Sequence, residues 1–192
     1  YLILADTSPF QSAQEVLDYI KANPGEFTYA NVGNGGNGHL AFASFLMGEG
    51  LDATSVPYTG GTADCYTAMM GGEVDSAVYG EADLLARPEC HGVINLGSKS
   101  TMESLADIPT LADLGYEGYE TNNMAGFFYH KDVPDAAAAA FEAAVESVLT
   151  DEAFVERATA AGFVPYFAPG TELDKMSHQA METSQPVIDS LG

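Results

Sequence analysis

The most distinctive chemistry in the sequence is a glycine-rich turn that could hold an anion. Residues 33–39 read Gly-Asn-Gly-Gly-Asn-Gly-His and lie between an apolar-aromatic run, 27–32, and a helix-like run, 40–50. The spacing G-x-G-x-x-G between a strand and a helix is that of a dinucleotide-binding turn. Successive glycines also let backbone N–H groups converge beside the positive end of a helix dipole. The turn is therefore a nucleotide site, another anion site, or simply a tight turn.

A second turn of the same kind follows the next predicted strand. The residues after "ATSVP" are Tyr58, Thr59, Gly60, Gly61 and Thr62, and they open another helix-like run. Parallel strands would bring both helix N-termini to the same edge of a sheet. A dinucleotide site would also need an acidic residue at the end of this strand to hold the ribose hydroxyls, and none stands there.

Charge limits what such a site can bind. The chain has 6 Lys+Arg and 28 Asp+Glu, a formal net charge of -22 that would repel nucleic acid and anionic membranes. None of the basic residues lies near either turn in the sequence, so we expect backbone amides and helix dipoles to neutralise a bound anion. A small carboxylate fits this setting better than a polyphosphate, because a strongly acidic protein opposes a multiply charged ligand more.

Other catalytic and metal-binding patterns are missing from the sequence. The four histidines are widely separated, without H-x-x-x-H or H-E-x-x-H spacing, and there is no G-x-S-x-G sequence. Cys90 and His91 are adjacent, so in an extended segment they would point to opposite faces. We predict no catalytic residue, no metal site and no cofactor.

The two cysteines, Cys65 and Cys90, leave two possibilities open. They could form one disulfide bridge in an oxidising compartment, or remain two buried thiols. They are too few for a disulfide scaffold and lack the close pairing of a zinc site.

The order of predicted elements indicates an α/β fold. Ser12 and Glu15 fit a capping box that starts an amphipathic helix whose apolar stripe is Ala13, Val16, Leu17 and Ile20. An almost wholly apolar helix is predicted from about Leu40 to Met47, and we expect it to be covered on both faces. Strands and helices alternate, which predicts a parallel sheet covered by helices; the predicted strands are 27–32, 53–58, 73–80, 92–98 and 124–130.

From Pro134 onward the sequence is mainly helical. Phe141, Val145, Val148 and Leu149 form an apolar stripe that should be buried, yet this tail supplies hardly any sheet to bury it. We expect the covering sheet to come from sequence in front of this chain or from a partner chain.

Four stretches together carry a family resemblance over essentially the whole chain. They are "SPFQSAQEVLDYIKANPGEFTYANVGNGGNGHL", "VPYTGGTADCYTAMMGGEVDSAV", "SLADIPTLADLGYEGYE" and "QPVIDSLG". In order and spacing they resemble the solute-binding receptors of tripartite tricarboxylate transporters, the Bug-type periplasmic receptors.

The resemblance implies a periplasmic-binding-protein type II, or Venus-flytrap, architecture that catalyses nothing. Such a receptor closes on a small organic carboxylate or dicarboxylate in the periplasm and delivers it to membrane permease subunits, without being inserted in the membrane itself. The matching ligand-binding positions are Gly33, Asn34, Gly35, Gly36, Asn37, Gly38, His39, Tyr58, Thr59, Gly60, Gly61, Thr62, Tyr79 and Gly80.

The resemblance also implies that the chain is a fragment. Family members are longer at the front, with a secretion signal and most of the first lobe. By this match, residues 1–5 are a strand at the crossover between lobes, 6–122 are the second lobe, and 123–192 are the returning C-terminal part of the first lobe.

Several positions depart from the usual family pattern. Serines are common where Gly36 and Asn37 stand, a lysine is often seen at Thr59, and an Asp-Asn pair is frequent at Tyr79 and Gly80. The ligand therefore stays open, and an aromatic or less charged acid becomes plausible. The alternatives are a nucleotide-dependent enzyme that uses the glycine turn, and a ligand-sensing module for signalling.

Overall fold

The computed structural model describes residues 1–121, 125–161, 163 and 165–191. The chain divides into two compact units, Tyr1–Asn123 with Glu182–Gly192, and Met124–Met181. The predicted lobe boundary at residue 122 falls among residues 122–124, which lie outside the described part. Residues 182–192 group with the first unit, although the sequence placed the whole of 123–192 together.

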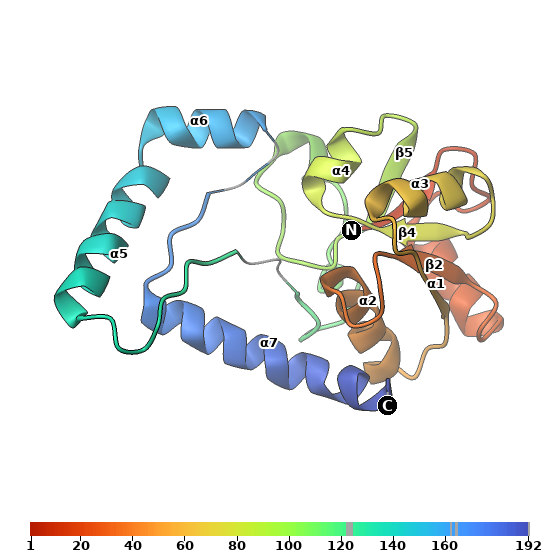
Figure 1. Ribbon diagram of the computed structural model, residues 1–192. Coiled ribbons are helices and arrows are strands. Elements are labelled where there is room, and N and C mark those ends of the chain that lie inside the picture. The colour runs from red at the N-terminus through yellow and green to blue at the C-terminus, as the bar shows by residue number, and fades with distance from the viewer. Residues whose placement is uncertain (122–124, 162, 164, 192) are drawn as a thin grey trace. The chain divides into compact units, whose positions relative to one another are not determined.

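The first unit is built on one mixed five-stranded sheet (Figure 1). Its strand order is β3-β2-β4-β1-β5. The strands are β1 (Leu2–Ala5), β2 (Thr28–Asn31), β3 (Thr54–Pro57), β4 (Ser76–Val78) and β5 (Cys90–Ile94).

The prediction of a parallel sheet is right for part of this sheet and wrong for β1. Strand β2 runs parallel to β3 and β4, whereas β1 lies between β4 and β5 and runs antiparallel to both. The connection from β1 through the first helix to β2 is therefore no crossover of the βαβ kind. Strand and helix alternation alone does not reveal this, because the direction of β1 is fixed by partners more than seventy residues away.

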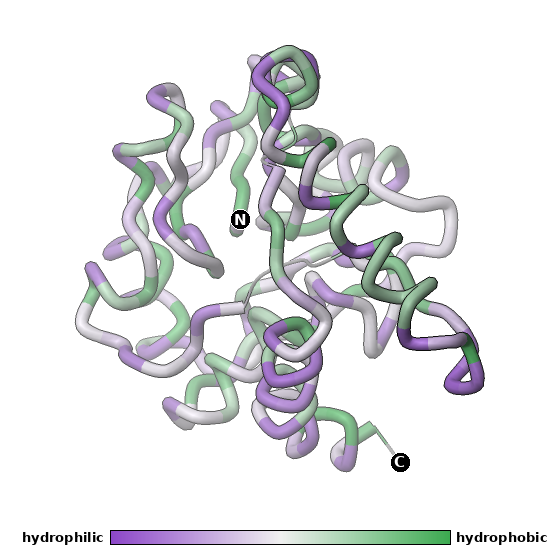
Figure 2. Tube along the Cα trace, turned by 90° about the vertical axis from the view of Figure 1, so that its left-hand side faces the viewer, coloured by the Kyte–Doolittle hydropathy of each residue, from purple (hydrophilic) through white to green (hydrophobic). Residues whose placement is uncertain are grey.

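Helices cover both faces of this sheet. They are α1 (Ala13–Ala22), α2 (Asn37–Gly48), α3 (Thr62–Met70) and α4 (Glu81–Leu85), with a 3-10 turn at Glu103–Leu105. Because neighbouring strand residues point to opposite faces, Leu2 and Leu4 of β1 pack with α1 and α2, while Ile3 packs with α3. Figure 2 shows the chain just after its N-terminus as hydrophobic, in keeping with the complete burial of Leu2, Ile3 and Leu4.

Helix α1 confirms the predicted cap and stripe. The Ser12 hydroxyl accepts the Glu15 N–H at 3.3 Å. The predicted stripe faces the core, and its four buried residues are Ala13, Val16, Leu17 and Ile20.

Helix α2 starts at Asn37, three residues before the predicted start. Phe42 and Phe45 are fully buried, and Tyr116 and Tyr119 pack edge-on against Phe45 at centroid distances of 5.0 and 5.5 Å. The expected cover on both faces is incomplete, because Met47 is 45% exposed.

The second unit corrects one prediction and leaves another untested. It contains α5 (Asp135–Leu149), α6 (Glu152–Ala160) and most of α7 (Gly170–Ser190). The stripe on α5 is exposed within the described residues, since Phe141 is 44% and Val148 50% exposed. The expectation that sequence outside this chain or a partner chain covers it stays a prediction. The predicted strand 124–130 is not a strand in Ala125–His130, and its Met124 lies outside the described residues. The described residues of this unit offer no neighbouring strand to pair with it.

Across the described ranges, none of the helices is both long and apolar enough to traverse a bilayer.

Candidate ligand-binding site

Three neighbouring strands bring the predicted site residues to one edge of the sheet (Figure 1). Strands β2, β3 and β4 are parallel, so their carboxyl ends at Asn31, Pro57 and Val78 lie together. Each end runs through a short turn into a helix N-terminus: α2, α3 or α4. The turn 33–39, the turn 58–62 and the pair Tyr79–Gly80 therefore all lie along this edge.

The glycine turn is shaped by backbone conformations that favour glycine. Gly33 and Gly35 have φ values of 128° and 79°, in the region that residues with a Cβ rarely adopt. The Gly36 N–H closes the turn by donating to the Gly33 carbonyl at 3.1 Å.

Asn31 anchors this turn to the sheet, and the sequence analysis missed it. Its Oδ1 accepts the Gly33 N–H at 2.9 Å, and its Nδ2 donates to the Ser55 hydroxyl on β3 at 2.7 Å. The side chain is completely buried. A second buried asparagine, Asn95 after β5, makes the same bond to the Gly97 N–H at 2.9 Å. The repeated pattern Asn-x-Gly at the end of a strand, Asn31 as the last residue of β2 and Asn95 directly after β5, is the signal that could have identified both.

His39 holds the glycine turn from inside. Its ring is 5% exposed, and its Nδ1 accepts the Gly35 N–H at 3.2 Å. Because an accepting Nδ1 carries no proton, the imidazole is neutral in this arrangement, and burial lowers its pKa. The ring also stacks on Tyr29, with centroids 6.4 Å apart. His39 was predicted to bind the ligand, but its Nδ1 is already occupied by the hydrogen bond from the Gly35 N–H.

The N-terminus of α2 is well suited to an anion. The N–H groups of Gly38 and His39 in its first turn have no protein acceptor within the described part of the chain. Its cap residue, Gly36, supplies no capping side chain, and its first turn has no acidic residue, whereas each of the other described α-helices has one there. The positive end of the α2 dipole thus has no acidic side chain in its own first turn.

The second turn is less favourable to an anion. Gly61, with φ at 84°, caps α3, and Asp64 lies in the first turn of that helix. The Asp64 carboxylate folds so closely over Gly60 that a Cβ there would clash with it. An anion bound at this turn would meet a like charge.

The end of β4 contains a polar cluster that the sequence did not predict. The Tyr79 hydroxyl donates to the Thr62 carbonyl at 3.2 Å, and Tyr79 itself is buried, which raises its pKa. The Arg87 guanidinium lies 4.9 Å from the centre of the Tyr79 ring and pairs with Asp83 at 2.7 Å. Although no basic residue is near either turn in the sequence, Arg87 lies close to the second turn in space, because both Asp83 and Tyr79 bond to Thr62. Thr62 and Arg87 are too far apart in the sequence for local patterns to predict this proximity. It arises because Asp83 of α4 accepts a hydrogen bond from Thr62 of α3.

The remaining predicted positions differ in exposure. Thr59 and Gly80 are exposed and Tyr58 is partly buried. A Cβ on Gly80 would meet nothing within 4 Å, so this strand end is open.

The structure contains no disulfide between the two cysteines. Cys65 and Cys90 are both free and buried, and Cys90 contacts Met70, with the two sulfur atoms 3.9 Å apart. Of the two possibilities that the sequence left open, the structure has the buried thiols.

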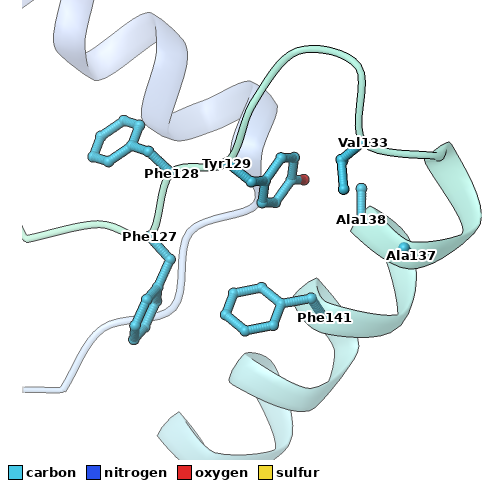
Figure 3. Close-up of a pocket in the computed structure, with 7 residues that line it drawn as sticks. All are labelled: Phe127, Phe128, Tyr129, Val133, Ala137, Ala138 and Phe141. Atoms are coloured by element: carbon cyan, nitrogen blue, oxygen red, sulfur yellow. The ribbon is translucent and has the colours of Figure 1, made fainter.

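The second unit carries an apolar cavity that contains none of the predicted site residues. Its volume is about 390 Å³. Phe127 and Phe141 lie next to each other in the lining (Figure 3). Their ring centres are 5.4 Å apart and their planes stand at 83°, an edge-to-face arrangement. Phe128, Tyr129, Val133, Ala137 and Ala138 complete the lining. Such a lining offers almost no group for a charged ligand.

The fold and the edge site define the class of the protein. A helix-covered sheet with glycine turns at the carboxyl ends of its parallel strands, together with the likeness to solved TctC and BugD structures, assigns the chain to the periplasmic-binding-protein type II folds. The family model described as "Tripartite tricarboxylate transporter family receptor" matches residues 1–192. The chain belongs to this family.

Curated relatives match almost all of the chain. A UPF0065 protein of Bordetella pertussis is 28% identical over 186 residues, which cover 96% of this chain and 57% of that protein. A UPF0065 protein of Cupriavidus necator is 23% identical over 193 residues, covering 100% and 58%. The chain thus spans less than two thirds of the length of these relatives.

Solved structures share the fold at low sequence identity. A TctC solute binding protein from Polaromonas has a TM-score of 0.80 at 18% identity, covering 98% of this chain and 65% of that one. R. palustris Rpa4515 with adipate gives 0.75 at 20% identity, covering 96% and 64%. MatC from Rhodopseudomonas palustris with bound malate gives 0.69 at 20% identity, covering 97% and 65%.

Proposed function

We propose that this chain is the ligand-binding part of a periplasmic receptor that captures a small organic carboxylate and presents it to the permease subunits of a tripartite tricarboxylate-type transporter. It catalyses no reaction. Family membership supports the receptor role. The structures of two relatives in complex with adipate and malate support a carboxylate as the ligand.

The observation that carries this proposal is the unopposed N-terminus of α2. The N–H groups of Gly38 and His39 and the positive helix end can together hold a carboxylate without a basic side chain. The glycines before them add no side chains of their own to the approach, and the Leu191 side chain lies beside Gly35. In the proposed complex the carboxylate lies at this turn, and the second turn and Gly80 contact the rest of the ligand.

The first unit is, in this proposal, the second lobe of the receptor, and the second unit is the returning part of the first lobe. The apolar side chains of the second unit support this assignment, since Phe127 is 69% and Phe128 83% exposed. Exposed aromatic groups of this size are normally covered. We propose that sequence outside these 192 residues covers them in the natural protein, whose relatives are substantially longer.

Calorimetric titration of the full natural protein tests the carboxylate proposal. Malate, adipate and benzoate serve as carboxylate probes, and NAD serves as the probe for a nucleotide site. We expect at least one acid to bind and NAD not to bind. The pyrophosphate of NAD would be repelled by Asp64 at this edge, and no acidic residue stands at the end of β3 to hold the ribose hydroxyls. Binding of NAD without binding of any acid would overturn the proposal.

The lobe assignment has its own test. The Phe128→Asp substitution should destabilise the full natural protein, because the Asp charge would be buried beneath the residues proposed to cover Phe128. The same change in the isolated 192-residue chain should leave the unfolding midpoint nearly unchanged, since this side chain is largely exposed there. Equal effects in both proteins would contradict the assignment.

A further inference from the structure

Arg87 occupies an unusually constrained place for one of the few cations in an acidic protein. Its Nη1 donates to the Asp83 carboxylate at 2.7 Å and to the Asp83 carbonyl at 3.0 Å. Its guanidinium carbon lies 5.0 Å from the ring centre of Tyr66 and 4.9 Å from that of Tyr79. The side chain is only 16% exposed. Two hydrogen bonds and two aromatic faces therefore fix its position.

Two of the three groups that Arg87 contacts, Asp83 and Tyr79, lead to Thr62, the first residue of α3. Asp83 Oδ1 accepts a hydrogen bond from the Thr62 hydroxyl at 3.1 Å. The Tyr79 hydroxyl donates to the Thr62 carbonyl at 3.2 Å. Arg87 thus connects α4 and the end of β4 to the backbone of the second turn.

The charge of Arg87 has a second effect at the same place. Asp83 is bonded directly to the first residue of α3, next to the turn that already carries Asp64. Without the guanidinium, the Asp83 charge would be uncompensated beside the ligand edge. An anion at this edge would then approach the Asp83 carboxylate as well as that of Asp64.

We propose that Arg87 is a positioning residue for ligand binding. It orients the start of α3 through Asp83 and Tyr79 and neutralises Asp83, without touching the ligand. This inference rests on the proposed carboxylate-receptor function, because it assigns the second turn a part in holding the acid.

The test combines ligand binding with hydrogen exchange in the full natural protein. Variants Arg87→Ala, Arg87→Lys and Arg87→Ala/Asp83→Asn are compared with Arg157→Ala. The last is a matched control, because Arg157 is an exposed arginine on α6 whose Nε donates to the Ala153 carbonyl in its own helix. Affinity for malate and adipate is measured by calorimetry, and amide exchange is followed at residues 62–65 and 33–39 without ligand.

We expect Arg87→Ala to weaken acid binding about tenfold, and Arg157→Ala to leave it unchanged. Raising the salt from about 20 mM to about 300 mM should restore part of the loss in Arg87→Ala, because salt screens the repulsion from Asp83. The added Asp83→Asn change should also restore part of it. Arg87→Lys keeps the positive charge but loses the stacking of a planar guanidinium on the two rings. Its loss of acid affinity should therefore be smaller than that of Arg87→Ala and should not respond to salt. A purely structural role would show neither the salt response nor the rescue by Asp83→Asn.

Exchange separates this proposal from the function on which it rests. Amides 62–65 should exchange about tenfold faster in Arg87→Ala, while amides 33–39 stay unchanged. Unchanged exchange at residues 62–65, or faster exchange with unchanged acid affinity, would overturn the proposal. Failure of the unmodified protein to bind any acid would instead overturn the carboxylate function, and exchange would still decide whether Arg87 positions the turn. If Arg87→Ala does not fold, Arg87→Lys and the double variant supply the same comparison.

Discussion

The Nδ1 atom of His39 accepts the backbone N–H of Gly35 at 3.2 Å, so a buried side chain in the first turn of α2 holds the loop that leads into its own helix. This bond exists only while Nδ1 has no proton. The stability of the glycine turn is therefore linked to the protonation of one histidine.

The first prediction concerns pH. Burial lowers the pKa of His39 below its ordinary value of 6.5, so the unfolded chain binds more protons than the native protein between the native pKa and 6.5. The free energy of unfolding should rise with pH across that window, and the contribution should be lost once pH falls through the native pKa. Urea unfolding at a series of pH values from 4.5 to 8 measures this, with pH steps of about half a unit.

A pair of variants isolates His39 from the other histidines. His39→Asn keeps an acceptor near the position of Nδ1 but does not titrate, so it should flatten this part of the pH profile. His130→Asn is the matched control, because that ring is 76% exposed. An unchanged slope in His39→Asn would show that the turn is not linked to this imidazole.

The second prediction compares the two anchoring asparagines. Asn31→Leu removes the side-chain bonds of Asn31 to the Gly33 N–H and the Ser55 hydroxyl, and Asn95→Leu removes those of Asn95 to the Gly97 N–H and the Ser98 carbonyl. Each should lower the free energy of unfolding by about 2 kcal/mol. Only Asn31→Leu should also weaken acid binding, because Asn31 holds the turn that leads into α2. Equal losses of affinity in both variants would place the acid elsewhere along the edge.

These residues show where sequence reasoning succeeded and where it stopped. The cap at Ser12, the strand-turn-helix units of both glycine turns and the stripe of α1 depend on neighbours within a few positions, and the sequence predicted them. The antiparallel direction of β1 and the approach of Arg87 to Thr62 depend on pairing between distant segments, which local patterns do not encode. Asn31 was missed for another reason: its pattern was present but was taken as the end of an apolar strand.

The third prediction concerns the cysteines. Burial raises the pKa of Cys90 to about 11 and also raises that of Cys65, so few thiolates form near neutral pH. Neither thiol should react with a disulfide reagent at pH 8 in the folded protein, whereas both should react after unfolding without a reductant. A sample treated with reductant before unfolding is the control, because it gives the total number of thiols that can react. No reactive thiol in the unreduced, unfolded protein would reveal a bridge.

The fourth prediction uses two glycines that differ in backbone conformation. Gly35 has φ at 79°, so Gly35→Ala strains the turn and should cost about 1 kcal/mol of stability together with a loss of acid affinity. Gly80 has φ at -80° and open space where a Cβ would stand, so Gly80→Ala should fold with an unchanged melting temperature. Any loss of affinity in Gly80→Ala would then report contact between the ligand and the end of β4. Thermal unfolding and calorimetry with malate measure both effects. If Gly35→Ala bound acid as well as the unmodified protein despite its lower stability, the glycine turn would not be the place where the carboxylate is held.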